Sequence, residues 1–427
     1  MTTASSLPVE IDADRLLADL AELSAIGAYK SGVHRPTFSA DDLRARAWFA
    51  DALAEAGLSP EIDGIGNVIG RSRAARVLLL GSHLESQPHA GRLDGPLGLL
   101  YGLALVRALR ATGEEVWVDI AAWADEEGWF GQFLGSRSFC GEVSEAEIDA
   151  ARHRSEGTPL RAALATAGLA AKPRAYLTPG RYLGYAEAHI EQGDRLESAG
   201  IRVGIVSAIV GMRKFIIVAE GVQNHAGTTR MAIRKDAGLA LCKLCVAIDA
   251  AFPAAAGPLS VWTTGRMRFE PGEPSVIPGR AEMYFQIRDP DTAVLERLSA
   301  RLRSLIAEAN ERGPCRLSAT PGPATVPAIM DAGMQDVFGV AAEALAPGAW
   351  MRMPSSAGHD AQTLARHMPA VMLFVPSIGG ISHHWAEDTR DEDIVLGARV
   401  FSEGVRRILA RPTLASPSLA KRILPGG

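Results

Sequence analysis

The sequence has few cysteines, no long apolar run and no surplus of basic residues, and each absence excludes a class of protein. The 427 residues include only four cysteines, Cys140, Cys242, Cys245 and Cys315. Four are too few for a disulfide framework in a chain of this length. Because Cys242 and Cys245 lie in a stretch of helical apolar spacing with no second cysteine pair, we predict a buried helix face there rather than a zinc site.

Membrane and nucleic-acid partners are also disfavoured by what the sequence lacks. No uninterrupted apolar run approaches the roughly 18 residues that a membrane-spanning helix needs. The first 20 residues have neither the basic nor the apolar segment of a signal peptide. The net charge of -5 and the isoelectric point near 6.1 leave no basic stripe for phosphates. We therefore expect a cytoplasmic protein that acts on a small molecule, without nucleic acid or membrane as a partner.

What is present is the composition of an ordinary globular protein, with 47% hydrophobic and 22% charged residues. The first part of the chain alternates between helical and strand-like segments, which predicts a sheet with helices packed on it. Ser39 precedes an acidic first turn, as the N-cap of a helix would. Helices are expected at 12–26, 39–58 and 95–112, and strands at 67–72, 75–82 and 116–124.

The pattern changes near Gly211 and changes back near Val326. Between them, strands are expected at 213–221, 259–271 and 281–289, and helices at 236–252 and 291–310. Two helices on an antiparallel sheet would form a compact insert. After the insert, residues 370–377 have the pattern of a buried strand.

We therefore predict a first domain of residues 1–211 and 327–427, interrupted by a smaller domain of residues 212–326. The Pro- and Ser-rich tail at 411–427 is expected to be mobile.

Histidines and acidic residues collect in glycine-punctuated segments, several of which follow predicted strands. Six of the ten histidines lie in such segments: His83, His189, His225, His359, His383 and His384. The acidic residues near them are Asp94, Asp125, Glu126, Glu127 and Glu191. A lone histidine beside a core strand is more often structural than a ligand. Several such histidines together with carboxylates favour a metal centre.

The donor types narrow the choice of metal. Imidazoles and carboxylates without thiolates suit Zn²⁺, Mn²⁺, Co²⁺ or Ni²⁺. Three histidines and two or more carboxylates exceed the needs of one ion, so the set could hold two ions roughly 3.5 to 4 Å apart with a bridging carboxylate. In an extended segment Glu126 and Glu127 point in different directions, so one can bind metal while the other takes a proton from the attacking water.

The segments that contain these residues resemble the M20 peptidase clan, and within it the amidases of hydantoinase/carbamoylase type. That group includes N-carbamoyl-L-amino-acid hydrolases, β-ureidopropionase and allantoate amidohydrolases. The likeness rests on segments that occur in family order over nearly the whole chain: GSHLESQPHAGRLDG, ADEEG, LGSRSFCG, AHIEQGDRLE, GIVSAIVGMRKF, NHAGTTRMAIRKDA, SVIPGRAEMYFQIRD, SSAGHDA and FVPSIGGISHHWAEDT. The resemblance implies an α/β catalytic domain with a central mixed sheet flanked by helices. It also implies that a small α+β lid domain interrupts the catalytic domain and joins two copies in a homodimer.

Carried over position by position, the resemblance implies five metal ligands: His83, Asp94, Glu127, His189 and His383. Asp94 would bridge two ions, and Glu126 would be the general base. His225 would stabilise the oxyanion, commonly in the site of the neighbouring subunit. Arg288 would bind a substrate carboxylate through its guanidinium. Gln192 and the backbone around Gly358 would line the same pocket.

Two positions depart from the family pattern. Two residues after the first ligand, the family usually has an aspartate that orients the imidazole; here Glu85 stands there, one methylene longer. Ser275 replaces the amide residue of the family segment NVIPG, which helps to bind the carboxylate end of the substrate. An amide offers both a hydrogen-bond donor and an acceptor, whereas serine offers a single hydroxyl. This change would alter which substrate fits.

Some of these residues also have interpretations without a role in catalysis. His384 could support the site or simply lie at the surface. His359 and Asp360 could act on substrate or form an interior hydrogen-bonded pair. Arg288 could be an interdomain ion-pair residue, and His89 is expected to be structural.

The predicted enzyme is a hydrolase of C–N bonds other than peptide bonds. It would cleave a linear amide or ureido bond, with an N-carbamoyl amino acid or related ureido acid as the favoured substrate. Two alternatives are an M20 dipeptidase or aminoacylase, which would share the metals, and a ligand-binding protein that has lost activity on the same fold. The Glu126 and Glu127 pair argues against the ligand-binding protein, because a binding module needs no base beside a metal.

Overall fold

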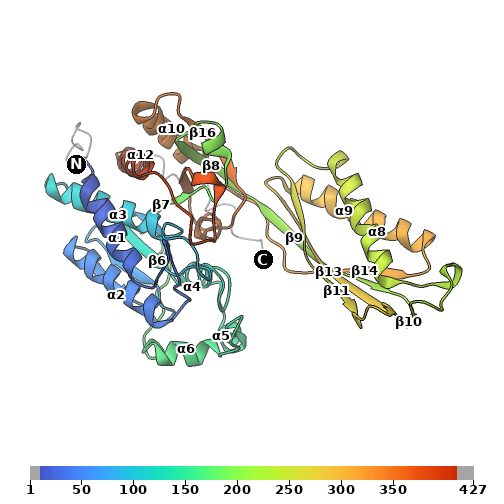
Figure 1. The fold of residues 1–427 in the computed structure, drawn as a ribbon. Helices are drawn as coiled ribbons and strands as arrows, with labels where there is room; N and C mark the ends of the chain where they lie inside the picture. Colours follow the sequence, from blue (N-terminus) through green and yellow to red (C-terminus); the bar gives the residue numbers. More distant parts are fainter. Residues whose placement is uncertain (1–9, 411–427) are drawn as a thin grey trace, which may run out of the picture. The chain divides into compact units, whose positions relative to one another are not determined.

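The computed structural model describes residues 10–410, and these fold into two compact units. The large unit comprises residues 10–207 and 329–410 of the described chain, and the small unit comprises Ala208–Ala328. In Figure 1 the small unit runs from green through yellow to orange. The tail at 411–427, predicted to be mobile, lies outside the described residues.

The large unit is built on a nine-stranded mixed sheet. Its central strands are parallel in the order β17, β7, β5, β6, and antiparallel neighbours extend the sheet on both sides. The predicted α/β class with a mixed central sheet is confirmed. The strands are β3 (Ser59–Ile62), β4 (Val68–Arg71), β5 (Val77–His83), β6 (Val118–Trp123), β7 (Tyr182–Ile190), β8 (Val203–Ile209), β15 (Ala328–Ile329), β16 (Trp350–Ser355) and β17 (Ala370–Val375).

Helices pack on this sheet and on each other (Figure 1). Helix α3 contacts β5, β6 and β7, α12 contacts α3 and β17, and α11 contacts β7 and β17. Ser39 caps α2 as predicted, because its hydroxyl accepts a hydrogen bond from the backbone N–H of Asp42 at 3.2 Å. The helices are α1 (Ala13–Ala25), α2 (Ala40–Glu55), α3 (Pro96–Ala111), α4 (Leu134–Phe139), α5 (Glu145–Ala150), α6 (Leu160–Thr166), α7 (Arg195–Ser198), α10 (Ala332–Leu345), α11 (Asp360–Leu364) and α12 (Asp391–Leu409).

Strand β7 separates the apolar core from a polar layer. Ala186 and Ala188 belong to the main hydrophobic cluster, together with residues of α3. Because side chains alternate along a strand, Glu187 and His189 point to the opposite face. There Glu187 accepts a hydrogen bond of 2.9 Å from the backbone N–H of Ala361 on α11. Glu187 and His189 therefore lie on the face of β7 away from α3.

The small unit has a four-stranded antiparallel sheet in the order β11, β13, β9, β14. Helices α8 and α9 lie side by side on one face of this sheet (Figure 1). A two-stranded ribbon of β10 and β12 stands apart from the sheet. The elements are β9 (Gly211–Glu220), β10 (Asn224–His225), α8 (Ala237–Ala251), β11 (Val261–Glu270), β12 (Val276–Ile277), β13 (Arg280–Asp289), α9 (Thr292–Arg312) and β14 (Arg316–Pro321).

One helical stretch of the small unit is strongly apolar although charged residues interrupt it. Residues Ala237–Ala254 form 18 residues of mean hydropathy 1.6, which by length and composition alone is enough to cross a membrane. Only 33% of this stretch is buried, with Leu244 and Ile248 packed into the core of the small unit. Lys243 and Asp249 interrupt the apolar residues of this stretch, so it contains no continuous apolar run of 18 residues.

The two cysteines of α8 do not both lie on its buried face. Cys242 is exposed and Cys245 is half-buried, so the predicted burial is wrong for Cys242. The physical reason is the helical period, since Leu241, Leu244 and Ile248 form the stripe that meets the sheet. All four cysteines are free thiols, in agreement with the absence of a disulfide framework.

Candidate metal centre

The five predicted ligands come from five segments that meet at the carboxyl-terminal ends of the central parallel strands. His83 ends β5, and His189 lies one residue before the end of β7. Glu127 lies in the loop after β6, His383 follows β17, and Asp94 directly precedes the N-cap of α3. The strand order reverses at β5, because β6 lies on one side of it and β7 on the other. In open α/β sheets ligands bind at such a reversal.

The carboxylate of Asp94 stands at the centre of these side chains. Its Oδ1 lies 3.3 Å from His83 Nε2 and 3.1 Å from His189 Nε2. Its Oδ2 lies 3.5 Å from His383 Nε2 and accepts a hydrogen bond of 3.0 Å from Gln192 Nε2. The two oxygens therefore face different sets of donors.

The donor atoms form three groups in which all atoms lie within 4.8 Å of one another. The groups are His83 with Asp94 and His189, Asp94 with Glu127 and His383, and His83 with Glu126 and Glu127. The first two groups share only the carboxylate of Asp94. Imidazole nitrogens and carboxylate oxygens at this spacing fit a divalent transition-metal ion such as Zn²⁺ or Mn²⁺.

Burial and contacts with neighbouring groups together set the pKa values of the acidic donors. Burial raises the pKa of Asp94, but hydrogen bonds to His189 and His83 outweigh it and hold that pKa well below its usual value. For Glu126, burial outweighs the attraction of His83 and leaves the pKa well above its usual value. Burial and then repulsion from Asp94 raise the pKa of Glu127 to about 8. Carboxyl groups that are costly to ionise in this environment become stable as carboxylates beside a cation.

Glu126 and Glu127 are adjacent in sequence but have different surroundings. The carboxylate of Glu127 accepts hydrogen bonds from Gln87, through its backbone N–H at 3.2 Å and its Nε2 at 2.6 Å. The Oε2 of Glu126 lies 3.9 Å from His83 Nε2. One carboxylate is thus held in place by an amide while its neighbour stands beside the first histidine.

Glu85 contacts the site through both its backbone and its side chain. The imidazole of His83 is oriented through its Nδ1 by the backbone carbonyl of Glu85 at 3.0 Å, rather than by the carboxylate. That carboxylate accepts a hydrogen bond of 2.6 Å from the backbone N–H of Glu126 and one of 2.8 Å from Arg46 Nη2. The side chain of Glu85 therefore reaches the loop that presents Glu126.

Asp125 shapes that same loop. Its φ of 60° lies in the left-handed region, which is uncommon for a residue other than glycine. Its carboxylate accepts hydrogen bonds from the backbone N–H groups of Trp129 and Gly131, both at 2.7 Å, and from the hydroxyl of Thr37 at 2.8 Å. The carboxylate of Asp125 therefore closes the loop that carries Glu126 and Glu127.

Three supporting residues were not predicted from the sequence: Gln87, Arg46 and Glu387. The buried Glu387 accepts a hydrogen bond of 3.3 Å from the backbone N–H of His383. A Cβ at Gly91 would come within 1.9 Å of Glu387 Oε1, so glycine is required at this close approach. Gln87 and Glu387 lie in sequence segments that resemble the family, and this resemblance could have pointed to them. Nothing in the sequence indicated Arg46.

Gln192 and Gly358, both predicted to line the substrate pocket, lie in the large unit. Besides binding Asp94, Gln192 donates its backbone N–H to Ser377 Oγ at 3.0 Å. Its Oε1 is buried and has no hydrogen-bond partner in the described part of the chain. At Gly358 a Cβ would come within 2.7 Å of the Phe133 ring.

Three further predicted residues belong to the small unit. His225 is exposed on β10, Ser275 directly precedes β12, and Arg288 is half-buried in β13. Burial lowers the pKa of Arg288. The backbone carbonyl of Ser275 accepts a hydrogen bond of 2.9 Å from Ala226. The functions expected of these three side chains stay predictions.

Two other histidines have structural contacts. His359 is buried, and its Nε2 lies 3.0 Å from Ser355 Oγ. Its ring centroid lies 4.6 Å from that of His189, so the two rings pack against each other in the interior of the large unit. His89 stacks on Tyr29 with 4.0 Å between ring centroids.

The chain is similar to known amidohydrolases along most of its length. It is 34% identical to the N-carbamoyl-L-amino acid amidohydrolase of Geobacillus stearothermophilus, over 92% of this chain and 97% of that protein. It is 31% identical to the allantoate amidohydrolase of Escherichia coli (strain K12), over 89% of this chain and 94% of that protein. A solved amidase of the hydantoinase/carbamoylase family from Burkholderia phymatum has 45% identity and a TM-score of 0.88, over 96% of this chain and all of that one.

These similarities confirm the resemblance to amidases of hydantoinase/carbamoylase type. They also confirm the enzyme class, a hydrolase of C–N bonds other than peptide bonds. The match to the M20 family covers residues 79–407, which include all five predicted ligands. The chain therefore belongs to Peptidase family M20/M25/M40.

Proposed function

We propose that this protein is a dinuclear metal-dependent amidohydrolase of the cytoplasm. Its substrate would be an N-carbamoyl amino acid or a related ureido acid, from which it cleaves a linear C–N bond. The observation that supports this most directly is the carboxylate of Asp94, whose two oxygens face different donors while Glu126 lies beside the first group. The similarity to amidohydrolases over most of the chain supports the reaction class.

The ligands divide between two ions in this proposal. His83, His189 and Asp94 would hold one ion, and Asp94, Glu127 and His383 would hold the other. Two divalent cations, Zn²⁺ or one of Mn²⁺, Co²⁺ and Ni²⁺, would polarise the scissile carbonyl and lower the pKa of water when bound.

Glu126 and His225 would move the proton and stabilise the developing charge. Glu126 takes a proton from the attacking water and delivers it to the leaving nitrogen. His225 donates a hydrogen bond to the oxyanion that forms from the carbonyl. With an N-carbamoyl amino acid, one water molecule is consumed, and the products are the amino acid, carbon dioxide and ammonia.

The substrate would be recognised at its carboxylate and at its ureido group. Arg288 binds the carboxylate through two parallel N–H donors. The Oε1 of Gln192 has an acceptor position to offer a ureido N–H. Ser275 would offer a hydroxyl to the carboxylate end of the substrate, and the backbone at Gly358 would contact the substrate. Together these groups would favour a small ureido acid.

The small unit would act as a lid and join two copies in a homodimer. It exposes apolar side chains on α8 and on the edge strand β11, including Val246 at 70% and Val261 at 47% of their surface. Exposed apolar patches and unpaired strand edges are features of interfaces. Sedimentation velocity at micromolar concentration should give the mass of a dimer, and a monomer across that range would contradict this part of the proposal.

The reaction itself can be distinguished from that of a dipeptidase or an inactive binding protein. With added Mn²⁺, we expect ammonia release from N-carbamoyl amino acids, allantoate, ureidoglycolate or β-ureidopropionate. We expect little release of amino acid from dipeptides and N-acetyl amino acids, and a chelator should abolish turnover. Preference for the peptide or acyl substrates would favour the dipeptidase or aminoacylase alternative. Absence of bound metal and of any chelator effect would favour a binding protein.

Glu126→Gln should separate catalysis from metal binding. Since the amide cannot accept the proton, kcat should fall by about 10²- to 10⁴-fold, while the metal content per chain stays near that of the wild type. Glu115→Gln is the matched control, because Glu115 is exposed. Atomic absorption and a coupled ammonia assay give both quantities. Retained activity in Glu126→Gln would remove Glu126 as the base.

Ser275→Asn should restore the amide that the family usually has at this position. If the natural substrate differs from N-carbamoyl-L-amino acids at its carboxylate end, kcat/KM on those compounds should rise by about 10-fold, since a hydrogen bond to a charged group is worth about 1.5 to 3 kcal/mol. Ser318→Asn, at an exposed position of β14, is the control. A lower kcat/KM in Ser275→Asn would instead show that the serine suits these substrates.

A further inference from the structure

The loop after His225 folds back onto its imidazole. The backbone N–H groups of Gly227 and Thr228 donate to His225 Nδ1 at 3.0 and 3.2 Å. The hydroxyl of Thr229 donates to the backbone carbonyl of His225 at 2.7 Å. A Cβ at Gly227 would lie only 3.3 Å from His225 Cε1, so glycine permits this close approach.

These bonds select one tautomer of the ring. Because two N–H groups point at Nδ1, that nitrogen must be the acceptor, and the ring proton is assigned to Nε2. Nε2 then presents one N–H on the side of the ring away from the loop. A ring that carries its proton on Nε2 can donate a hydrogen bond to an oxyanion.

The same loop is held from its other side by Arg234. The Nε of Arg234 donates to the backbone carbonyl of Thr229 at 3.0 Å, and its Nη2 donates to the carbonyl of Ala226. These two carbonyls bracket the two amides that bind His225 Nδ1. A guanidinium is planar and its donors point in set directions, so two such bonds define both the spacing and the tilt of the loop.

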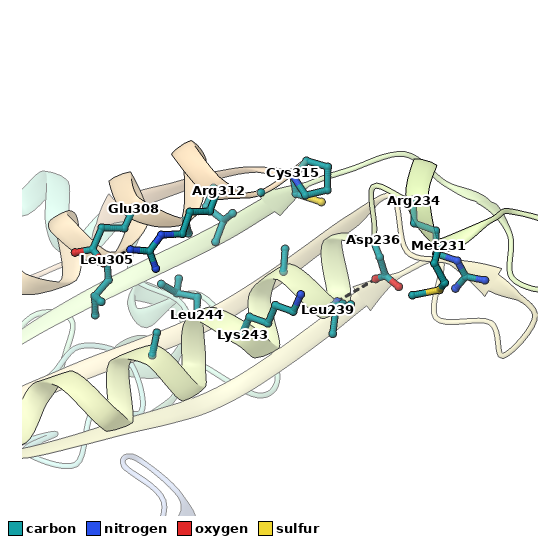
Figure 2. Close-up of a pocket in the computed structure, with 16 residues that line it drawn as sticks. Met231, Arg234, Asp236, Leu239, Lys243, Leu244, Leu305, Glu308, Arg312 and Cys315 are labelled. Carbon is teal, nitrogen blue, oxygen red and sulfur yellow. Dashed lines mark hydrogen bonds and ion pairs between the residues drawn. The ribbon is translucent and has the colours of Figure 1, made fainter.

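Arg234 lies where the chain approaches α8, and it lines a cavity of about 550 Å³ between α8 and α9 (Figure 2). Arg312 lines the same cavity from α9. Its side chain is 80% exposed and lies 3.9 Å from Glu308, so its electrostatic partner is another residue of α9. Both arginines are cationic and line the same cavity. Arg234 binds two backbone carbonyls of the loop after His225, whereas Arg312 is paired with Glu308.

We propose that Arg234 is a positioning residue for His225. By fixing the carbonyls of Ala226 and Thr229, it keeps the amides of Gly227 and Thr228 on Nδ1 and the donor N–H on Nε2. The inference rests on the proposed role of His225 in stabilising the oxyanion. Arg234 acts through the loop, so its loss should affect the chemical step more than substrate binding.

Kinetics with the metal-loaded enzyme test this coupling. In Arg234→Met, kcat should fall by about 10- to 100-fold, as for a misplaced catalytic group, with KM within about 3-fold of wild type. Arg234→Lys keeps the positive charge but loses the two-pronged guanidinium, so its kcat should lie between those of wild type and Arg234→Met. Arg312→Met should match wild type. In a His225→Ala background, Arg234→Met should cause no further loss; multiplied losses would overturn the proposal.

A spectroscopic test does not depend on which substrate is correct. In protein labelled with ¹⁵N-histidine, the signals of His225 are identified by their absence in His225→Ala. Wild type and Arg312→Met should show an acceptor Nδ1 and a protonated Nε2, whereas Arg234→Met should show a mixture of tautomers. An unchanged tautomer in folded Arg234→Met would contradict the proposal even if the amidohydrolase activity is found. If thermal unfolding shows that Arg234→Met does not fold, Arg234→Lys serves in both tests.

Discussion

The contact of the Asp94 carboxylate with three histidines is the constraint on which the site depends. His83 and His189 lie at the ends of β5 and β7 and His383 follows β17; these segments are far apart in sequence, yet all three histidines reach Asp94 within 3.5 Å. Gly95 makes this possible, because its φ of 88° turns the chain into α3 and a Cβ there would come within 2.6 Å of the His83 ring. A single short loop thereby brings the ends of the parallel strands to one point.

Around this centre, buried charge is paired in a way that supports the proposed base. Arg46 on α2 is 1% exposed and binds Asp42 at 2.9 Å and Glu85 at 2.8 Å. A buried cation is tolerated only with such partners, because leaving it unpaired would cost several kcal/mol. Glu85 in turn holds the backbone of Glu126. The packing of α2 is therefore linked to the position of the group proposed to move the proton.

The hydrogen bonds that orient His225 come from residues of the small unit itself. The backbone after His225 sets the direction of the imidazole, and Arg234 holds that backbone. Both sets of bonds lie inside the small unit. The large unit likewise positions its own acids and histidines. Of the residues named in the proposal, the metal ligands and Glu126 belong to the large unit, and His225 and Arg288 belong to the small unit.

The sequence by itself determined the α/β class, the strands that become β5 and β6, and the candidate donors, because apolar periodicity and glycine-flanked polar residues are local signals. It did not indicate β7, whose sequence YLGYAEAHI mixes small and polar residues and has no clear apolar alternation. Only the tertiary structure decided that the carbonyl of Glu85 orients His83 while its carboxylate holds Glu126. The same is true of Arg46, which looks like any exposed helical arginine until α2 is packed. Hydrogen bonds between segments depend on distances that no local pattern encodes. For this reason the candidate metal-binding residues could be named from the sequence, whereas the residues that hold them in place could not.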